Sequence, residues 1–383
     1  MKILLVTPSY FPIVGGSEKL THDLSIKLGE FDVHVDILTL NMNQKWRPTW
    51  KEDITKDGKA LVFREPAMAI FPSFLNRVFS PFRINVIPQL GFIEKLRLYD
   101  VVHFVGEADL SLPLLAFFIK KPKLLHSVGL FRNGGIYRYY TLVHPFLGKI
   151  FSRILPLVAD KFIVSSLEEK NLLMNMGLRE TKIVILPEGV DTETFKPNLL
   201  EKKENLILFV GRIEPIKGLH VLLSALTHIE TPLELVIVGP PWNPEYVKEI
   251  YKTIQTINNN GFHKVTTLGE LNSADLVSWY QKASVVICPF AYETYSNVVR
   301  EALACGTPVI STGSHILENA NDGILISKRN PRDLALQISY LLSKPKVREE
   351  LGKEGRKVIE KSYSWNIVIQ EFVRLYEESF PQK

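Results

Sequence analysis

The strongest constraint on the fold is a regular alternation of short apolar runs with segments of helical length. In the first half of the chain the apolar runs are KILLV (2–6), VHVDILTL (33–40), VVHFV (101–105), KLLHSV (123–128) and KFIVSS (161–166). A second series follows with LILFVG (206–211), ELVIVG (234–239), KVTTLG (264–269), SVVICP (284–289) and TPVIST (307–312). Continuous apolar runs are typical of parallel strands that are buried on both faces. The pattern predicts an α/β protein with two doubly wound parallel sheets.

The 383 residues are enough for two domains, each with its own core. The joint is predicted in IVILPEGVDTETFKPN (183–198), so that the domains span 1–186 and 187–363. The proline-rich segment 64–92 is interpreted as an irregular excursion of the first domain, a lid or an acceptor surface. The closing segment 364–380 spaces five apolar residues as in an amphipathic helix that covers either domain: Trp365, Ile369, Phe372, Leu375 and Tyr376.

The positive charge lies in the first half of the chain. Residues 1–186 hold 24 Lys and Arg against 17 Asp and Glu, whereas residues 187–383 hold 22 against 24. Eight of the cations fall in 110–165, among aromatic residues and with Asp160 as the single acid. This stretch fits either a solvated face or a surface that rests on anionic lipid. The cations are dispersed and form no recognised module, so nucleic acid is not expected as a partner.

The location of the protein is predicted from what the sequence lacks. The first apolar run is too short for a signal peptide, and no run reaches the length of a membrane span. Cys288 and Cys305 are the only cysteines, and both lie in apolar segments as expected of free buried thiols. We therefore expect a cytoplasmic protein, with peripheral association with the inner face of the cell membrane as one alternative.

The stretch ETYSNVVREALACGTPV (293–309) contains two glutamates, Glu293 and Glu301. It follows the apolar run 284–289 as a polar turn and a helix, so both carboxylates can face the crevice at the carboxyl ends of the strands. The free backbone N–H groups at residues 294–298 would seat a phosphate, and carboxylates suit sugar hydroxyls. The alternative is that Glu293 caps the helix and that Glu301 is a solvated helix residue.

Two cations flank the end of another predicted strand. In VGRIEPIKG, Arg212 follows the strand directly and Lys217 stands at the entry to a helix, where a diphosphate could be held. Gly239 ends the next strand and would let a ligand approach the backbone. Taken singly, the cations are as consistent with a solvated pair, and Gly239 with an ordinary turn.

In the first half, Gly15 and Gly16 join the first strand to the first helix and permit close approach of a phosphate or a sugar. They belong neither to a G-x-G-x-x-G fingerprint nor to a phosphate loop. His126 ends a strand and is a candidate for contact with substrate, with His103 and Glu107 as weaker ones. The alternative is that His126 is a structural group, as a lone histidine near a strand more often is. The sequence has no H-E-x-x-H, C-x-x-C or G-x-S-x-G motif, so no metal site is predicted.

Together the GRIEPIKG segment, the two-glutamate element, the joint ILPEGVDTETFKP, the double glycine and the closing SWNIVIQEFVRLYEE resemble glycosyltransferase family 4, retaining enzymes with the GT-B fold. The resemblance covers the whole chain and is more specific in the second half. It implies two Rossmann-like domains that face a central cleft. The second would bind the nucleotide-sugar donor, and residues 364–383 would complete the first, acceptor-side domain.

The resemblance also implies roles for individual residues. Arg212 and Lys217 would bind the donor diphosphate, Glu293 the transferred sugar and Glu301 the ribose, while Gly16 would border the phosphates and His126 would contact the sugar. The backbone near three residues of the helix start would meet phosphate and sugar: Tyr295, Ser296 and Asn297.

The implied reaction moves a sugar from a UDP-, GDP- or ADP-sugar to a glycan, lipid-linked or small-molecule acceptor, without a cofactor or metal. Two departures from the family pattern leave the donor sugar open: Glu188 replaces the usual asparagine, and Thr294 to Ser296 replace glycine-rich residues. Alternatives on the same fold are an epimerase, a phosphorylase or a non-catalytic module that binds sugar nucleotides.

Overall fold

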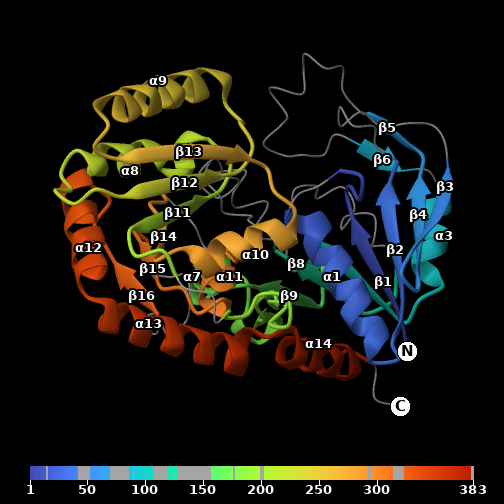
Figure 1. Cartoon of the computed structure of the whole chain (residues 1–383). Helices are drawn as coiled ribbons and strands as arrows, with labels where there is room; N and C mark the ends of the chain where they lie inside the picture. The colour runs from blue at the N-terminus through green and yellow to red at the C-terminus, as the bar shows by residue number, and fades with distance from the viewer. Residues whose placement is uncertain are drawn as a thin grey trace. The chain divides into compact units, whose positions relative to one another are not determined.

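The structure, a computed structural model, describes residues 1–13, 16–41, 52–69, 86–88, 90–106, 119–127, 157–175, 177–198, 202–291, 295–313 and 323–380. The chain divides into two compact units, which are described separately (Figure 1). Unit 1 comprises Met1–Glu188 and Val368–Lys383, and unit 2 comprises Gly189–Ile367. The predicted α/β class is confirmed, because each unit is built on a mainly parallel sheet with helices.

The sheet of unit 1 has eight strands in the order β10-β9-β8-β7-β1-β2-β4-β3. All neighbours are parallel except β3 and β4, which form an antiparallel hairpin at one edge. The strands are β1 (Lys2–Thr7), β2 (His34–Leu40), β3 (Asp53–Asp57), β4 (Ala60–Glu65), β7 (Val101–Val105), β8 (Lys123–His126), β9 (Lys161–Val164) and β10 (Ile183–Ile185). A separate antiparallel pair is formed by β5 (Ala67–Ala69) and β6 (Val86–Pro88).

The helices of unit 1 described in the structure are α1 (Gly16–Glu30), α3 (Leu90–Arg97), α7 (Leu167–Asn175), a 3₁₀ turn (Glu180–Lys182) and most of α14 (Trp365–Glu378). All five apolar residues that the sequence spaced along the last helix are buried, which confirms the predicted amphipathic helix. Most of the excursion predicted at 64–92 lies outside the described residues.

The sheet of unit 2 has six strands, all parallel, in the order β13-β12-β11-β14-β15-β16. They are β11 (Leu206–Val210), β12 (Glu234–Val238), β13 (Lys264–Gly269), β14 (Val285–Cys288), β15 (Val309–Ser311) and β16 (Ile324–Ile326). Apolar clusters lie on both faces of the sheet, one with Leu208 and Val286 and the other with Ile207 and Ile287. Neighbouring residues of one strand thus enter different cores, as a buried parallel strand requires.

The helices of unit 2 are α8 (Leu219–Leu226), α9 (Pro244–Asn260), α10 (Ser273–Lys282), α11 (Asn297–Ala304), α12 (Pro331–Ser343) and α13 (Pro345–Val358). A 3₁₀ turn (Pro215–Lys217) precedes α8, and a π-helix (Ile359–Tyr363) follows α13. Asparagine side chains cap α9, α10 and α12 by accepting a backbone N–H of the first turn. After α11, Gly306 adopts a left-handed conformation with φ 67°, which is typical of glycine at the end of a helix.

All ten predicted strands are present. Six of the described strands were not predicted. Four have three residues each (β5, β6, β10 and β16), and β3 is a polar edge strand. The sixth, β4, has six residues, the last two being Arg64 and Glu65. β10 lies inside the predicted joint, where prolines and polar residues obscure it.

The two chain crossings between the units begin from one short ladder within unit 2. Val190 forms a parallel bridge with Ser364, with backbone hydrogen bonds from Val190 N to Tyr363 O (2.7 Å) and from Trp365 N to Val190 O (3.0 Å). A Cβ atom on Gly189 would overlap the Trp365 ring, so only glycine fits there. The segment that enters unit 2 at Gly189 is therefore paired with the segment that precedes α14.

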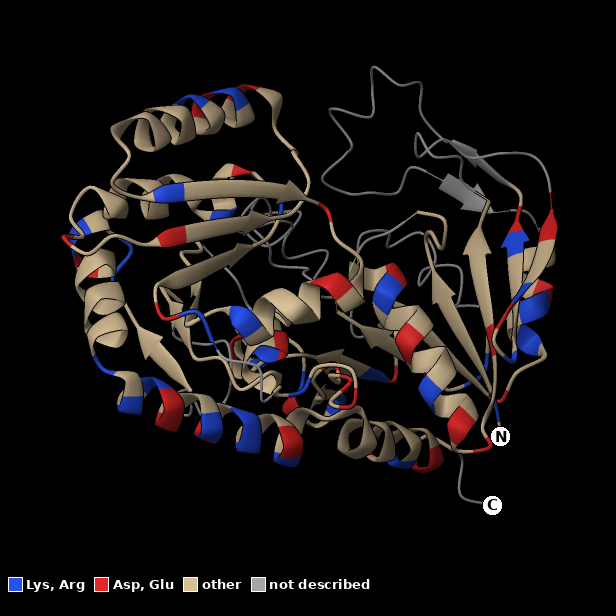
Figure 2. Cartoon of the chain, in the orientation of Figure 1, with Lys and Arg blue, Asp and Glu red and all other residues tan. Residues whose placement is uncertain are grey.

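Charged side chains of both signs are interspersed along α1 and α13 (Figure 2). Most of the basic stretch 110–165 lies outside the described residues. Two of its cations that are described contact the protein itself, since Lys123 Nζ donates to Ile119 O and Lys161 Nζ to Thr181 O. Within the described parts of the chain, we find no helix with the length and apolar character needed to span a membrane.

Candidate donor site and the residues predicted from sequence

The order of strands in unit 2 reverses at β11. The chain runs from β11 to β12 and β13 on one side and then returns to place β14 on the other. In doubly wound sheets, ligands bind beyond the carboxyl ends of the strands at such a switch point. Arg212 comes two residues after β11, and Pro289 directly follows β14. The predicted cations therefore stand at the expected ligand-binding edge of this sheet.

The turn after β11 packs directly on the loop after β14. The backbone N–H of Ala291 donates to Ile216 O at 2.8 Å. Gly218 has a φ of 74°, and a Cβ atom there would overlap the carbonyl of Pro289. Lys217 Nζ lies 5.0 Å from the centroid of the Phe290 ring, a cation–π contact. Lys217 is thus held between the ends of two adjacent strands.

Arg212 is held by a carboxylate and an aromatic ring. Its Nη2 lies 2.7 Å from Glu214 Oε1, and its Cζ lies 4.5 Å from the centroid of the Trp242 ring. About a third of the Arg212 side chain (33%) is exposed, so an anion can reach the guanidinium. The indole of Trp242 is itself 60% exposed, which is unusual for so large an apolar side chain.

Gly239 stands at the end of β12, beside the same edge. Its φ is 139°, and a Cβ atom would overlap the carbonyl of Gly211. The backbone N–H of Gly211 donates to Val238 O at 2.9 Å, and that of Gly239 donates to Gly269 O at 2.7 Å. The glycine therefore lets the ends of β11 and β12 meet.

The start of α11 lies in the chain segment that follows β14. Ser296 caps the helix, and its Oγ accepts the backbone N–H of Val299 at 3.4 Å. Asn297 is the first helical residue, and Tyr295 precedes the cap. Glu293 lies outside the described residues. The helix therefore begins at the position predicted for a phosphate, with the serine side chain capping its first turn.

Glu301 lies one turn into α11 and is only 7% exposed. The hydroxyl of Tyr280, on α10, donates to Glu301 Oε2 at 3.0 Å. Burial, followed by the charge of Glu301, raises the pKa of Tyr280 well above its ordinary value, so the phenol stays protonated and donating. Glu301 is thus an oriented carboxylate, not the solvated helix residue that the sequence left as the alternative.

In unit 1 the corresponding reversal lies between β1 and β7. Gly16 is the first residue of α1, and Gly15 lies outside the described residues. A Cβ atom on Gly106, at the end of β7 with φ 90°, would lie 3.0 Å from Ser17 Cβ. Glu18 is buried, and it accepts hydrogen bonds from Ser9 Oγ and Ser17 Oγ. The carboxylate of Glu18 ties the loop after β1 to the first turn of α1.

His126 lies at the end of β8, as predicted, but its side chain is fully buried. Its ring stacks on that of His103 with centroids 5.5 Å apart, and His103 Nδ1 lies 2.7 Å from the Tyr376 hydroxyl. Among the described residues, neither ring nitrogen of His126 has a hydrogen-bond partner. Contact between this imidazole and a sugar therefore requires a rearrangement of unit 1 around β8. Glu107 lies outside the described residues.

The structure thus gathers Arg212, Lys217, Gly239 and the start of α11 at one edge of unit 2, while Gly16 and His126 belong to unit 1. Sequence reasoning missed three residues that hold this edge: Glu214, Trp242 and Tyr280. Glu214 lies within the quoted GRIEPIKG motif, but the other two approach from distant segments and gave no signal. Among the described residues, no group of three or more His, Cys, Asp or Glu side chains could hold a metal ion.

The chain is similar to known proteins over most of its length. A family model described as Glycosyltransferase Family 4 matches residues 14–194, and one described as Glycosyl transferases group 1 matches residues 190–358. An uncharacterized glycosyltransferase of Methanocaldococcus jannaschii is 30% identical over 407 residues, which cover 98% of each chain. The chain belongs to glycosyltransferase family 4. The resemblance inferred from the sequence is confirmed.

Solved structures of glycosyltransferases share the fold of this family-4 chain. Sucrose-phosphate synthase from Thermosynechococcus elongatus superposes with a TM-score of 0.75 and 21% identity over 98% of both chains. Anabaena HepE in complex with UDP and glucose gives a TM-score of 0.73 and 16% identity, over 99% of this chain and 100% of that one. The predicted GT-B fold with two Rossmann-like domains is confirmed.

The buried histidines of unit 1 predict a loss of stability in acid. Burial lowers the pKa of His126 to about 3, and burial together with the charge of His126 lowers that of His103 well below its ordinary value. In the unfolded chain each imidazole binds a proton with a pKa near 6.5, so above that pH neither state is protonated and the two histidines do not destabilise the fold. Below pH 6.5 only the unfolded chain takes up these protons. The free energy of unfolding therefore falls by up to about 1.4 kcal/mol per pH unit for each histidine as the pH falls from 6.5 toward 3.

We expect His126→Phe to reduce the drop in unfolding free energy between pH 7 and pH 5 by about 2 kcal/mol, measured by urea denaturation. The matched control is His228→Phe, because His228 is exposed. If both variants show the pH dependence of the wild type, His126 is not a buried neutral group.

Proposed function

We propose that this family-4 glycosyltransferase moves a sugar from a nucleotide-diphosphate sugar to an acceptor hydroxyl, with retention of configuration and without a metal ion. The observation that carries the proposal is the position of Arg212 and Lys217 after β11, the strand where the order of the sheet reverses. Lys217 also lies against Phe290, in the loop that leads from β14 to the start of α11. Two cations and a helix start meet the needs of a diphosphate. In the solved complex, HepE holds UDP and glucose, which supports this class of donor.

The donor diphosphate would bind to both cations. The planar guanidinium of Arg212 offers parallel N–H donors, and the ammonium of Lys217 acts as a point charge. Glu214 already pairs with Arg212, so a diphosphate competes with that carboxylate. The backbone N–H groups around Tyr295, Ser296 and Asn297 add the positive end of the helix dipole.

The hydroxyl groups of the donor would be held by carboxylates. We assign Glu301 to the ribose, because Tyr280 fixes the orientation of its carboxylate. Glu293 is assigned to the transferred sugar on the family resemblance. Gly16 and Gly15 would allow the donor phosphates to approach the loop after β1, and Gly239 lets the end of β12 meet that of β11 at the proposed donor site.

In the reaction, the acceptor oxygen forms a bond to the anomeric carbon on the face from which the phosphate departs. The bond between that carbon and the phosphate oxygen breaks, its electron pair stays on the phosphate, and the departing phosphate takes the acceptor's proton. Fixed cations stabilise the developing charge without reorganisation. His126 contacts the sugar near the reacting carbon only after β8 and its surroundings rearrange.

The acceptor is proposed to be a glycan, a lipid-linked saccharide or a small molecule. A peripheral position on the inner face of the cell membrane, through the basic stretch 110–165, belongs to the same proposal, as does a cytoplasmic location. Cys288 and Cys305 are buried and form no disulfide, which is consistent with a reducing compartment.

Nucleotide binding should depend on both cations. UDP, GDP and ADP, each tested without divalent metal, should include one that raises the melting temperature. Arg212→Ala and Lys217→Ala should each weaken its binding about 10- to 100-fold by calorimetry, because a lost charge-assisted contact costs about 1.5–3 kcal/mol. Lys252→Ala, an exposed cation on α9, is the control and should bind as the wild type does. Unchanged affinity in both site variants would refute the diphosphate assignment.

The role of Glu301 is tested by removing the hydroxyl that it should bind. The wild type should prefer a ribonucleotide donor over its 2′-deoxy analogue by about tenfold or more, as expected for loss of a hydrogen bond to a charged group. The preference should largely disappear in Glu301→Gln and persist in Glu249→Gln, where the carboxylate is exposed on α9. Equal affinity of the wild type for both donors would argue against this role.

Retention should be visible in the first product formed. With an α-linked donor, we expect an α-linked product, read from the anomeric proton coupling by NMR before any mutarotation. A β-linked product would contradict the retaining mechanism. A glycosyl adduct trapped on Glu293, detected by mass spectrometry, would instead show a covalent nucleophile.

A further inference from the structure

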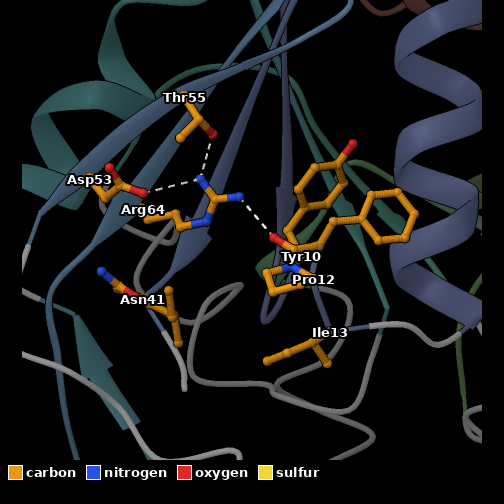
Figure 3. Close-up of a pocket in the computed structure, with 9 residues that line it drawn as sticks. Tyr10, Pro12, Ile13, Asn41, Asp53, Thr55 and Arg64 are labelled. Carbon is orange, nitrogen blue, oxygen red and sulfur yellow. Dashed lines mark hydrogen bonds and ion pairs between the residues drawn. The ribbon is translucent and has the colours of Figure 1, made fainter. Parts of the chain in front are cut away.

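A pocket of about 340 Å³ opens in unit 1 at the carboxyl ends of β2 and β4 and beside the loop that follows β1 (Figure 3). Its walls are the loop 10–13, Leu40 and Asn41 at the end of β2, and three residues of the β3–β4 hairpin: Asp53, Thr55 and Arg64. The volume is at the small end of the range for ligand pockets, about 300–1,000 Å³. It suits one small ligand or the terminal ring of a larger one.

The charges in this pocket are matched. Arg64 Nη1 donates to Thr55 Oγ1 at 2.6 Å and lies 3.5 Å from Asp53 Oδ2, while Nη2 donates to the carbonyl of Phe11 at 2.8 Å. The Arg64 side chain is only 15% exposed, whereas that of Asp53 is 52% exposed. A ligand therefore meets the carboxylate of Asp53 more readily than the guanidinium, which is mostly buried and donates to Thr55 and Phe11.

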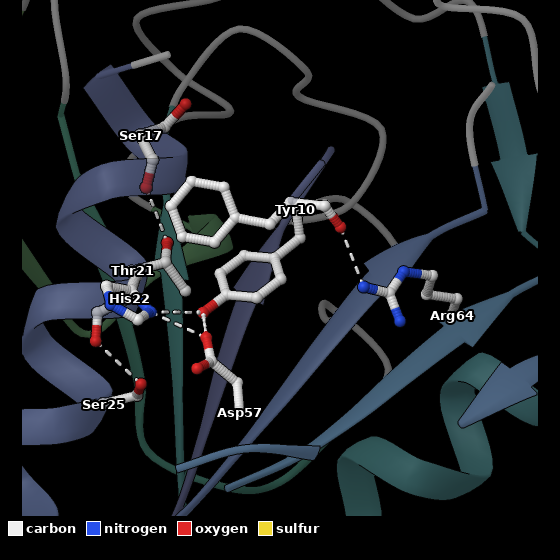
Figure 4. A network of polar contacts seen from close by, with 8 residues as sticks. Tyr10, Ser17, Thr21, His22, Ser25, Asp57 and Arg64 are labelled. Atoms are coloured by element: carbon white, nitrogen blue, oxygen red, sulfur yellow. Dashed lines mark hydrogen bonds and ion pairs between the residues drawn. The ribbon is translucent and has the colours of Figure 1, made fainter. Parts of the chain in front are cut away.

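The aromatic wall is fixed from behind. The hydroxyl of Tyr10 donates to the carboxylate of Asp57, and His22 Nδ1 lies 2.7 Å from Asp57 Oδ2 (Figure 4). The Phe11 ring packs against both, with its centroid 5.1 Å from those of Tyr10 and His22. Burial and the bond to Asp57 raise the pKa of Tyr10, so its hydroxyl remains a donor. Because these contacts already hold the Tyr10 and Phe11 side chains in place, a ligand that binds here loses little free energy to ordering them.

The pocket shares a chain segment with the predicted donor-phosphate loop. Residues 10–13 line the pocket, and the same connection between β1 and α1 reaches Gly16 three residues later. Ser9, one residue before the wall, is tied to Glu18 in the first turn of α1. A ligand in this pocket therefore lies next to the loop that the proposed function assigns to the donor.

We infer that this pocket binds the acceptor, and that the acceptor group it takes is a neutral, hydroxyl-rich ring such as a sugar or another polyol. The inference rests on the proposed function and adds to it the chemical class of the acceptor. Sugar hydroxyls donate to the carboxylate of Asp53, and the Asn41 amide both donates and accepts. The apolar C–H face of the ring packs on Pro12, Ile13 and Leu40. An anionic group would instead be repelled by the exposed carboxylate of Asp53, while the positive charge of Arg64 is mostly buried and lies next to Asp53.

A matched pair of probes tests this class directly. Methyl β-D-glucoside and methyl β-D-glucuronide differ only at C6, where a carboxylate replaces the hydroxymethyl group, and the galactose and mannose counterparts extend the pair. Binding to the full chain is measured by saturation-transfer NMR and by titration. We expect at least one neutral glycoside to bind, and its charged partner to bind at least tenfold more weakly.

Two variants place the ligand in this pocket. Asp53→Ala and Asn41→Ala should each weaken binding of the neutral glycoside about tenfold. Glu94→Gln, an exposed carboxylate on α3, is the control and should bind as the wild type does. The melting temperature of each variant, with and without the nucleoside diphosphate, shows whether it is folded.

Three results would overturn the inference: tighter binding of the charged probe, no binding of any neutral glycoside, or unchanged affinity in both pocket variants. Failure of the proposed function is seen separately, because it would show as a lack of nucleotide binding in the wild type. Nucleotide binding without glycoside binding would reject only the acceptor class.

Discussion

Burial of parallel strands on both faces determines where polar side chains can stand in this protein. All five residues of β11 are buried, as are all four of β14, because a core lies on each side of the sheet. A charged group inside such a strand would lose its hydration without compensation. Polar residues therefore collect where strands end, and parallel strands end at one edge. The position of Arg212 and Lys217 follows from this constraint, as does that of the start of α11.

The same constraint explains what the sequence could predict. Continuous apolar runs marked ten strands, and the polar residues just after them marked the donor-site candidates. The pocket of unit 1 that Asp53 and Arg64 line gave no such signal in the sequence. Arg64 meets Asp53 only because β3 pairs antiparallel with β4, and β3 is a polar edge strand without an apolar run. Tyr280 and Trp242 likewise reach Glu301 and Arg212 from other elements. Contacts that depend on the pairing of distant segments cannot be read from local spacing.

Arg212 shows how a cation is kept in place in the absence of an anion. The pair with Glu214 is partly exposed and contributes at most about 1 kcal/mol to stability, as is usual for such pairs. Its larger effect is geometric, because the carboxylate and the Trp242 ring together restrict the guanidinium to one position. A flexible arginine would lose more side-chain entropy when it bound a phosphate. A phosphate that bound Arg212 would compete with Glu214 for the N–H donors of the guanidinium.

The ladder between Val190 and Ser364 has a mechanical consequence. A polypeptide crossing alone can rotate about each of its backbone bonds, so a single connection resists twisting only weakly. Here both crossings leave unit 2 from residues that share backbone hydrogen bonds, with Trp365 packed against Gly189. A rotation of one connection is therefore transmitted to the other through the bridge between Val190 and Ser364. Where they leave unit 2, the two connections are thus a hydrogen-bonded pair with fewer rotational degrees of freedom than two independent linkers would have.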